Sequence, residues 1–328
     1  MKKIVALATA ILITLVGITS CGAKPEPVDV NVMALKGPTA MGMVKMMKDV
    51  EDKEIEDNNY SFKIASSIDE VTPALVKGDV DIAAVPANMA SVLYNTQDKN
   101  IQVLGVNTLG VIYICETGDS VKSVKDLKGK TIYASGKGAT PEYALNYILE
   151  ENGLKPGKDV KIEWKSEHSE CVAAIAKDKN AIAMLPQPFV AAAQVKNPNI
   201  KVALDLTKEW DSLQEEKDDS TLITGVVVAR KDFVEKNPEV VKVFLENYKK
   251  SVDFVNKNTE EAAKLIGGYD IVPAKVAEKA LPQCNIVLLT GDEMEDKLSG
   301  YLEILAKQNP KAVGGKVPDD DFYFGAED

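Results

Sequence analysis

The sequence predicts an α/β protein of two similar lobes, in which mixed, mainly parallel sheets are joined by a hinge. Short apolar segments alternate along the chain with segments of helical periodicity, which is typical of βαβ units. One such unit occurs twice, about 100 residues apart. The chain that follows a short N-terminal leader has about 300 residues, more than one hydrophobic core usually supports.

The N-terminus has the layout of an export signal. Lys2 and Lys3 precede an apolar run over residues 4–16, which is shorter than the about 20 residues of a membrane-spanning helix. A small residue just before Cys21, with an aliphatic residue three positions upstream of it, resembles a bacterial lipoprotein processing site. This resemblance implies removal of residues 1–20 and lipid attachment at Cys21, palmitate included, which anchors the protein to the outer face of the bacterial cell membrane. The alternative is an ordinary signal peptide with an incidental cysteine.

Composition limits the partners and the covalent chemistry. The net charge of −11 argues against nucleic acid, whose phosphates attract a basic surface. Residues 21–27 contain prolines and are expected to form a tether between the lipid and the folded protein. The other cysteines, Cys115, Cys171 and Cys284, are odd in number, so at least one is unpaired. We expect all three to pack as small apolar side chains.

The repeated unit defines the two lobes. Each copy contains a short apolar strand that ends in a proline, Ile82–Pro86 and Ile182–Pro186, followed by a helical stretch and a second strand. The repeat extends upstream, where strands expected at residues 29–34 and 131–134 each enter a glycine-containing loop and then a helix. Strands that alternate with helices in this way favour parallel pairing, so two similar lobes are expected.

Local signals place the helix boundaries. Ser67 and Glu70 have the spacing of a capping box, Thr72 is a competing start, and Gly78 is a stop signal. Thr140, followed by proline, is expected to cap the helix after it. The tail opens with a strand expected at residues 222–229, and its helices are expected at residues 238–256, 259–266, 273–281 and 292–307.

Two longer phrases carry a resemblance to a known family. The chain resembles the substrate-binding subunits of ABC importers in the phrases DLKGKTIYASGKGATPEYALNYIL and VVVARKDFVEKNPEVVKVFLENY. It is most similar to the group of nitrate, sulfonate, taurine and thiamine-precursor binders, which have the type II periplasmic-binding fold. The resemblance spans nearly the whole mature chain. It implies that residues 28–113 and 222–328 form lobe one with the C-terminal helices, and that residues 114–221 form lobe two.

The resemblance also implies a role. An extracytoplasmic protein of this kind captures a small molecule, here an anionic or heteroaromatic one, between its lobes and delivers it to a permease and its ATPase. The expected protein is a monomer without a cofactor, a metal or a catalytic residue. The lobes would close about the two chain crossings, where Gly110 and Gly225 can absorb backbone change.

The candidate ligand contacts lie in loops after successive strands, because ligands of open α/β sheets bind beyond the carboxyl ends of the strands. They are Lys36, Gly37, Pro38, Thr39, Ala40, Met41, Ser66, Ser67, Pro86, Ala87, Asn88, Ser135, Gly136, Lys137, Gly138, Ala139, Thr140, His168, Pro186 and Gln187. Two of the loops end at helix N-termini, which favour an anionic group, and Lys36 and Lys137 would add charge. The alternative is that these lysines are solvated and the glycines only turn the chain.

Other side chains of these loops suggest how a ligand would be oriented. Asn88, Ser67 and Gln187 are expected to form hydrogen bonds with it, although each alone is more often an ordinary surface residue. Met41 and Met43 are expected to line the cleft with adaptable apolar surface. An aromatic ligand would stack on one of the available rings, which are those of Tyr94, Tyr113, Tyr133, Tyr143 and Phe189.

An enzyme of the same fold, acting on a pyrimidine or carboxylate metabolite, is the main alternative. The only histidine, His168, has Glu167, Glu170 and Cys171 nearby, but no second cluster completes a metal site or a nucleophile with its base. We expect His168 to form a hydrogen bond in the cleft or to occupy an ordinary loop position. A surface adhesin or a sensor built on the same lobes is a third reading, which neighbouring genes for a permease and an ATPase would exclude.

Overall fold

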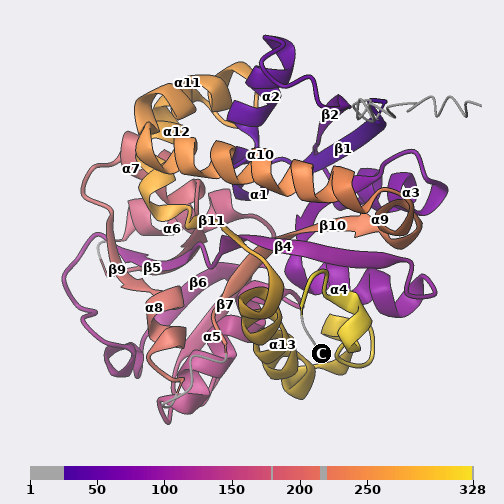
Figure 1. Ribbon diagram of the computed structural model, residues 1–328. Helices are drawn as coiled ribbons and strands as arrows, with labels where there is room; N and C mark the ends of the chain where they lie inside the picture. The colour runs from indigo at the N-terminus through magenta and orange to yellow at the C-terminus, as the bar shows by residue number, and fades with distance from the viewer. Residues whose placement is uncertain (1–25, 179, 215–219, 327–328) are drawn as a thin grey trace, which may run out of the picture.

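The computed structural model describes residues 26–178, 180–214 and 220–326, which form two β-sheets flanked by helices (Figure 1). We call the six-stranded sheet with its helices the first lobe, and the five-stranded sheet with its helices the second lobe. The strand order is β11-β4-β10-β3-β1-β2 in the first sheet and β7-β6-β8-β5-β9 in the second. The expected α/β fold with two mixed sheets is confirmed.

The strands lie where the apolar segments of the sequence are. Those of the first sheet are β1 (Asp29–Leu35), β2 (Asn59–Ala65), β3 (Ile82–Pro86), β4 (Ile101–Leu109), β10 (Ile223–Arg230) and β11 (Ile286–Leu289). Those of the second sheet are β5 (Ile112–Glu116), β6 (Thr131–Ser135), β7 (Lys161–Lys165), β8 (Ile182–Pro186) and β9 (Lys201–Asp205).

The helices fill the segments between the strands and most of the C-terminal third. Before the chain returns to the first sheet they are α1 (Pro38–Met41), α2 (Val44–Glu51), α3 (Ile68–Lys77), α4 (Ala87–Thr96), α5 (Thr140–Glu151), α6 (His168–Lys177), α7 (Phe189–Lys196) and α8 (Leu206–Asp211). After the return they are α9 (Lys231–Lys236), α10 (Pro238–Lys257), α11 (Thr259–Gly268), α12 (Ala274–Ala280) and α13 (Gly291–Gln308). Short 3₁₀ turns occupy Val124–Leu127, Leu281–Gln283, Pro310–Val313 and Asp320–Phe322. No helix within the described ranges combines the length and apolar character needed to cross a bilayer.

The strand pairing confirms the internal duplication. β1 pairs in parallel with β2 and β3, and β6 pairs in parallel with β7 and β8. β10 lies antiparallel between β3 and β4, and β5 lies antiparallel between β8 and β9. Each sheet therefore has the same central arrangement. One antiparallel strand lies between the two strands of the repeated unit, which are β3 and β4 in the first sheet and β8 and β9 in the second.

Two of the local helix signals act as the sequence predicts. Ser67 caps α3 by accepting a hydrogen bond from the Asp69 amide, and Gly78 ends the helix in the left-handed conformation, with φ of 81°. Thr72 lies inside α3, so the competing start there is wrong. The expected cap at Thr140 is also wrong, because Ala139 is the N-cap residue of α5 and the Thr140 hydroxyl is bonded elsewhere.

The chain passes between the sheets at two places. The first is Gly110 and Val111, since β4 ends at Leu109 and Ile112 already pairs with Pro186 in the second sheet. The passage therefore lies slightly before the boundary after Tyr113 that the sequence predicts. The second lies between α8 and β10.

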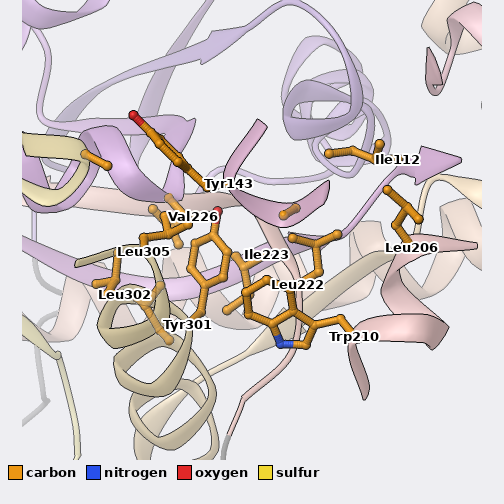
Figure 2. Packing of buried hydrophobic residues seen from close by; sticks show 14 of the residues in the cluster. Ile112, Tyr143, Leu206, Trp210, Leu222, Ile223, Val226, Tyr301, Leu302 and Leu305 are labelled. Atoms are coloured by element: carbon orange, nitrogen blue, oxygen red, sulfur yellow. The ribbon is translucent and has the colours of Figure 1, made fainter. Parts of the chain in front are cut away.

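The apolar cores of the two lobes are continuous. α13 lies between α4 of the first lobe and α5 of the second, both of which it contacts (Figure 1). Its Tyr301 packs against Trp210 of α8, with ring centroids 5.8 Å apart. Figure 2 shows Tyr301 with Trp210 on one side and with Leu302 and Leu305 on the other. The C-terminal helix thus fills the junction of the lobes with large buried side chains.

The three cysteines outside the leader are free and buried, as expected. Burial raises the pKa of the Cys115 and Cys284 thiols to about 12. The thiolate, which is the reactive form, is therefore strongly disfavoured in both.

Candidate functional site

The candidate contacts occupy corresponding edges of the two sheets. Because β1, β2 and β3 are parallel, the loops that follow them meet at the same edge of the first sheet, and those after β6, β7 and β8 do so at the second. We call residues 36–41 the first-lobe loop and residues 135–140 the second-lobe loop.

Only the beginning of the first-lobe loop faces solvent. Lys36 is exposed and its ammonium lies 3.1 Å from a carboxylate oxygen of Asp270, which is itself almost fully exposed. Gly37 has φ of 130°, which favours glycine, and a Cβ there would meet no atom within 4 Å. Gly37 is itself buried, but open space lies on the side of its backbone where a Cβ would be.

Residues 39–41 of the first-lobe loop are buried, which corrects part of the sequence prediction. Ala40 and Met41 are fully buried, as is Met43, and they pack in the core that contains α10. The methionines therefore do not line a cleft. Thr39 is 5% exposed, and its hydroxyl donates to the Leu35 carbonyl.

A buried side-chain amide, that of Asn107, holds this loop on the side that faces the core. Asn107 of β4 donates to the Thr39 carbonyl at 3.0 Å and to the Tyr248 hydroxyl at 3.1 Å. Gly225 of β10 lies against the same place, where a Cβ would come 2.3 Å from Thr39 Cγ2. Strand β4, which precedes the first chain crossing, and strand β10, which follows the second, therefore both contact the first-lobe loop.

The second-lobe loop is more exposed and is held at three points. The Gly138 amide donates to Glu142 at 2.6 Å, and the Gly138 carbonyl accepts from the Tyr143 hydroxyl at 3.1 Å. The Thr140 hydroxyl lies 3.2 Å from that of Tyr301. Lys137 is exposed, and a Cβ at Gly138 would meet no atom within 4 Å.

Acidic side chains accept hydrogen bonds from backbone amides just before several helices. Glu70 accepts from the Ser66 amide, and Glu170 accepts from the amides of Ser166 and Glu167, as Glu142 does from Gly138. Each carboxylate neutralises part of the positive end of its helix. An anionic ligand at these loops would therefore meet a carboxylate next to each of these helix starts.

His168 forms the centre of a small polar and aromatic cluster. Its Nδ1 lies 2.5 Å from the hydroxyl of Ser135, which is 3% exposed. Its ring packs against Phe189, with centroids 4.6 Å apart. Burial lowers the pKa of His168, and the negative charge of Glu167 offsets this only in part. The imidazole is therefore neutral at pH 7 and carries one N–H.

Of the five candidate aromatic rings, Phe189 is the accessible one. Its residue is 40% exposed at the start of α7. Tyr94, Tyr113 and Tyr143 are buried. Tyr133 is half-buried under the ammonium of Lys165, which lies 5.1 Å from the ring centroid.

The two amide side chains at the proline-ended strands are used within the protein. Asn88 donates to the Ala312 carbonyl at 3.3 Å. Gln187 is 2% exposed, donates to Gln283 at 2.6 Å and accepts from the Ala191 amide. Both ends of Gln187 are thus engaged, and its amide joins the lobes rather than facing a ligand. Sequence reasoning missed Gln283 because no local pattern marks it.

The remaining candidates differ in exposure. Ser66, Ala139 and the second-lobe glycine Gly138 are exposed, whereas Pro38, Ser67, Pro86, Gly136 and Pro186 are half-buried and Ala87 is buried. Two cavities of the described surface lie away from all the candidates. One of about 260 Å³ is bordered by α3, α4 and Arg230, and one of about 550 Å³ adjoins the amino ends of β1 and β2.

The described residues contain no group of three or more His, Cys, Asp or Glu side chains able to hold a metal ion. The polar groups that the loops do present are hydroxyls, ammonium groups and one imidazole. This set suits hydrogen bonding to a small polar molecule.

The sequence matches a family model. The model is described as "ABC transporter, phosphonate, periplasmic substrate-binding protein", and it matches residues 53–278. No curated protein matches the chain.

Solved structures share the fold. An ABC transporter protein from Parabacteroides distasonis is 24% identical, with a TM-score of 0.73 over 90% of this chain and 98% of that one. The periplasmic aliphatic sulphonate binding protein SsuA from Escherichia coli is 19% identical, with a TM-score of 0.69 over 88% and 91%. The periplasmic nitrate-binding protein NrtA from Synechocystis PCC 6803 is 14% identical, with a TM-score of 0.58 over 88% and 83%.

Proposed function

Because the chain belongs to the family of periplasmic substrate-binding proteins of phosphonate ABC transporters, we propose that it captures a small oxyanion between its lobes and delivers it to a permease. The observation that carries this proposal is the duplicated arrangement of loops at the carboxyl edges of both sheets. Each lobe offers one exposed lysine and one glycine with open space above it, at Lys36 and Gly37 and at Lys137 and Gly138.

The ligand class follows from these groups. A phosphonate or a sulfonate carries several acceptor oxygens and no donor in its ionised form. Lysine ammonium groups, backbone amides and a histidine N–H are all donors, so they complement such a head group. With Nδ1 next to the Ser135 hydroxyl, His168 would present Nε2 to the ligand.

Phe189 adds a preference for the rest of the ligand. Its exposed ring beside His168 offers apolar surface to an alkyl or aromatic substituent. An organic oxyanion therefore suits the second lobe better than an inorganic one. This feature favours alkylphosphonates and alkylsulfonates over nitrate as ligands.

Capture requires no covalent step. The ligand would enter with the lobes apart and would then contact both of them. It would favour the closed form by the difference between its binding free energies for the closed and open forms. The closed form would then dock on the permease, whose ATPase drives release. We propose that the protein acts as a monomer and catalyses no reaction of its ligand.

We further propose that lipid on Cys21 keeps the protein at the outer face of the cell membrane. Cys21 lies outside the described residues, and the proposal rests on the layout of residues 1–21 in the sequence. Anchoring by several acyl chains is stable, whereas one chain holds a protein only marginally. Attachment near the permease raises the effective concentration of the receptor there.

A thermal-shift panel tests the ligand class directly. Methylphosphonate, methanesulfonate and nitrate are compared with acetate and uracil. A ligand at about a hundred times its dissociation constant stabilises the protein by about 2.7 kcal/mol. Stabilisation by the phosphonate or sulfonate supports the proposal, whereas stabilisation by uracil alone would contradict it. Mass spectrometry of small molecules released from the purified protein would identify the natural ligand.

A further inference from the structure

The second-lobe loop is not supported by the second lobe alone. Two of its supports come from residues 301–309, which lie at the end of α13 and in the turn after it. We call residues 301–309 the C-terminal brace. The contacts are direct for Thr140 and pass through Tyr143 for Gly138.

The direct contact joins two hydroxyl groups. Tyr301 is fully buried, and its hydroxyl lies 3.2 Å from that of Thr140. Burial raises the pKa of the Tyr301 phenol, so it remains protonated and able to donate at neutral pH. Thr140 is the first residue of α5, and the contact therefore fixes the point where the loop enters the helix.

The indirect contact is a relay of two hydrogen bonds. The Asn309 amide donates to the Tyr143 hydroxyl at 2.8 Å, and that hydroxyl donates to the Gly138 carbonyl at 3.1 Å. The side-chain oxygen of Asn309, Oδ1, also accepts from the Lys311 amide, so both polar atoms of this side chain are hydrogen-bonded. Gly138 has φ of 77°, only one of the backbone regions open to glycine, and the relay favours this one over the others.

The brace is also bound to the first lobe. The turn after it is bound to α4, where Ser91 donates to the Val313 carbonyl at 2.8 Å and Asn95 donates to the same oxygen. α13 also contacts β4 of the first sheet. A group anchored in one lobe thus sets the backbone of the ligand loop in the other.

We propose that Tyr301 and Asn309 are positioning residues, which hold the second-lobe loop in its ligand-binding conformation when the lobes are together. This inference rests on the proposed function, because it assigns the loop a ligand. A loop already ordered before binding loses less entropy when the ligand arrives, so its affinity is higher. The brace thereby links closure of the lobes to the order of the loop.

The experiment compares wild type with Tyr301→Phe and Asn309→Ala, and uses Tyr94→Phe as the matched control. Tyr94 is equally buried and its hydroxyl is bonded to Asp321, away from both loops. Two quantities are measured in each protein: the hydrogen-exchange rates of amides in residues 136–140 without ligand, and the dissociation constant for methanesulfonate or methylphosphonate by calorimetry. Melting temperatures monitor the fold.

We expect exchange in the loop to become about three- to tenfold faster, and affinity about three- to tenfold weaker, in both brace variants and not in the control. Unchanged loop exchange would overturn the inference whether or not a ligand binds. Faster exchange with unchanged affinity would reduce the brace to a structural contact and would also overturn it. If Tyr301→Phe fails to fold, Asn309→Ala alone decides between these results.

Failure of the proposed function is recognised separately. If wild type binds neither probe, the oxyanion assignment is wrong, while the exchange rates still report whether the brace orders the loop. If wild type binds a probe and the brace variants match it, the proposed function stands and the inference falls.

Discussion

The backbone of Gly110 lies directly against the side chain of Thr207, so that a Cβ on residue 110 would come 2.2 Å from the Thr207 hydroxyl oxygen. The same Cβ would lie 2.7 Å from the Leu222 side chain. Gly110 is one of the two residues through which the chain first passes between the sheets. The crossing is therefore closely packed. Thr207 and Leu222 can lie this near the backbone because Gly110 has no side chain.

Gly110→Ala should consequently destabilise the protein by about 1–3 kcal/mol, the usual cost of overpacking. Urea unfolding measures the change. Gly268→Ala is the matched control, because a Cβ there meets no atom within 4 Å and the residue ends α11. The control should be neutral or up to about 1 kcal/mol more stable, since alanine favours helix. Equal stability of the two variants would show that the crossing can relax.

Asp81→Ala should destabilise the protein by about 2–4 kcal/mol without changing ligand affinity. The Asp81 side chain is 9% exposed, lies 2.9 Å from the Arg230 guanidinium and accepts from the Asn31 amide. Its removal leaves the partly buried Arg230 guanidinium with only the more exposed Asp232 as a partner. The carboxylate precedes β3, at the end of the sheet opposite the ligand loops.

Asp232→Ala provides the comparison, since Asp232 pairs with the same guanidinium but is 51% exposed. Its loss should cost less than about 1 kcal/mol. Urea unfolding and calorimetry on both variants separate stability from binding. A weakened methanesulfonate affinity in Asp81→Ala would contradict the expected separation.

Lys137→Gln should weaken methanesulfonate binding about two- to fivefold, because an exposed charge contributes up to about 1 kcal/mol. The deficit should shrink as salt is added, since exposed charges are screened. Lys128→Gln removes an equally exposed charge at the amino end of β6, away from the loop. Equal losses in both variants would point to net charge rather than a local contact.

Acidification should destabilise wild type more than His168→Gln. Burial lowers the pKa of His168 in the folded protein, so the unfolded chain, with a pKa of about 6.5, takes up the proton first. The free energy of unfolding should therefore fall as pH decreases from about 7 toward the folded pKa, and this contribution is complete only above about 7. Urea titrations at about pH 7.5 and pH 5.5 on both proteins test the difference. Parallel pH dependence in the two would remove His168 as the source.

Cys21→Ser should release the protein into the medium and impair uptake by cells, while the ligand affinity of the purified protein stays unchanged. The physical reason is that, under the proposed anchoring, lipid on this residue would supply the membrane affinity, whereas the folded lobes would supply the binding. Fractionation of cells and medium, followed by calorimetry on the released protein, makes both measurements. Retention of the variant on the cell surface would argue for a different anchor.

Sequence patterns located the elements that depend on short segments. The strands Ile82–Pro86 and Ile182–Pro186 have the predicted bounds, because each is a short apolar run closed by a proline. Gly78 ends α3 for the equally local reason that glycine tolerates a positive φ. The three free cysteines are buried as predicted from their number and surroundings.

Features that depend on distant parts of the chain were missed. β11 (Ile286–Leu289) has too few residues to show a period, and it forms only by pairing with β4. Met41 is buried by a core that includes α10, and Gln187 is used by Gln283. The loop positions follow from the strand pattern, whereas the direction of each side chain depends on these long-range contacts.

The position of β10 has a consequence for the order in which the protein is made. β10 is the strand that joins β3 to β4, and it is translated only after the whole second lobe has been synthesised. Until then the first sheet is split into two parts, although its first four strands have already been synthesised. The second lobe is one uninterrupted stretch of chain and can fold first. During synthesis, the lobe that begins the polypeptide is thus the last to be completed.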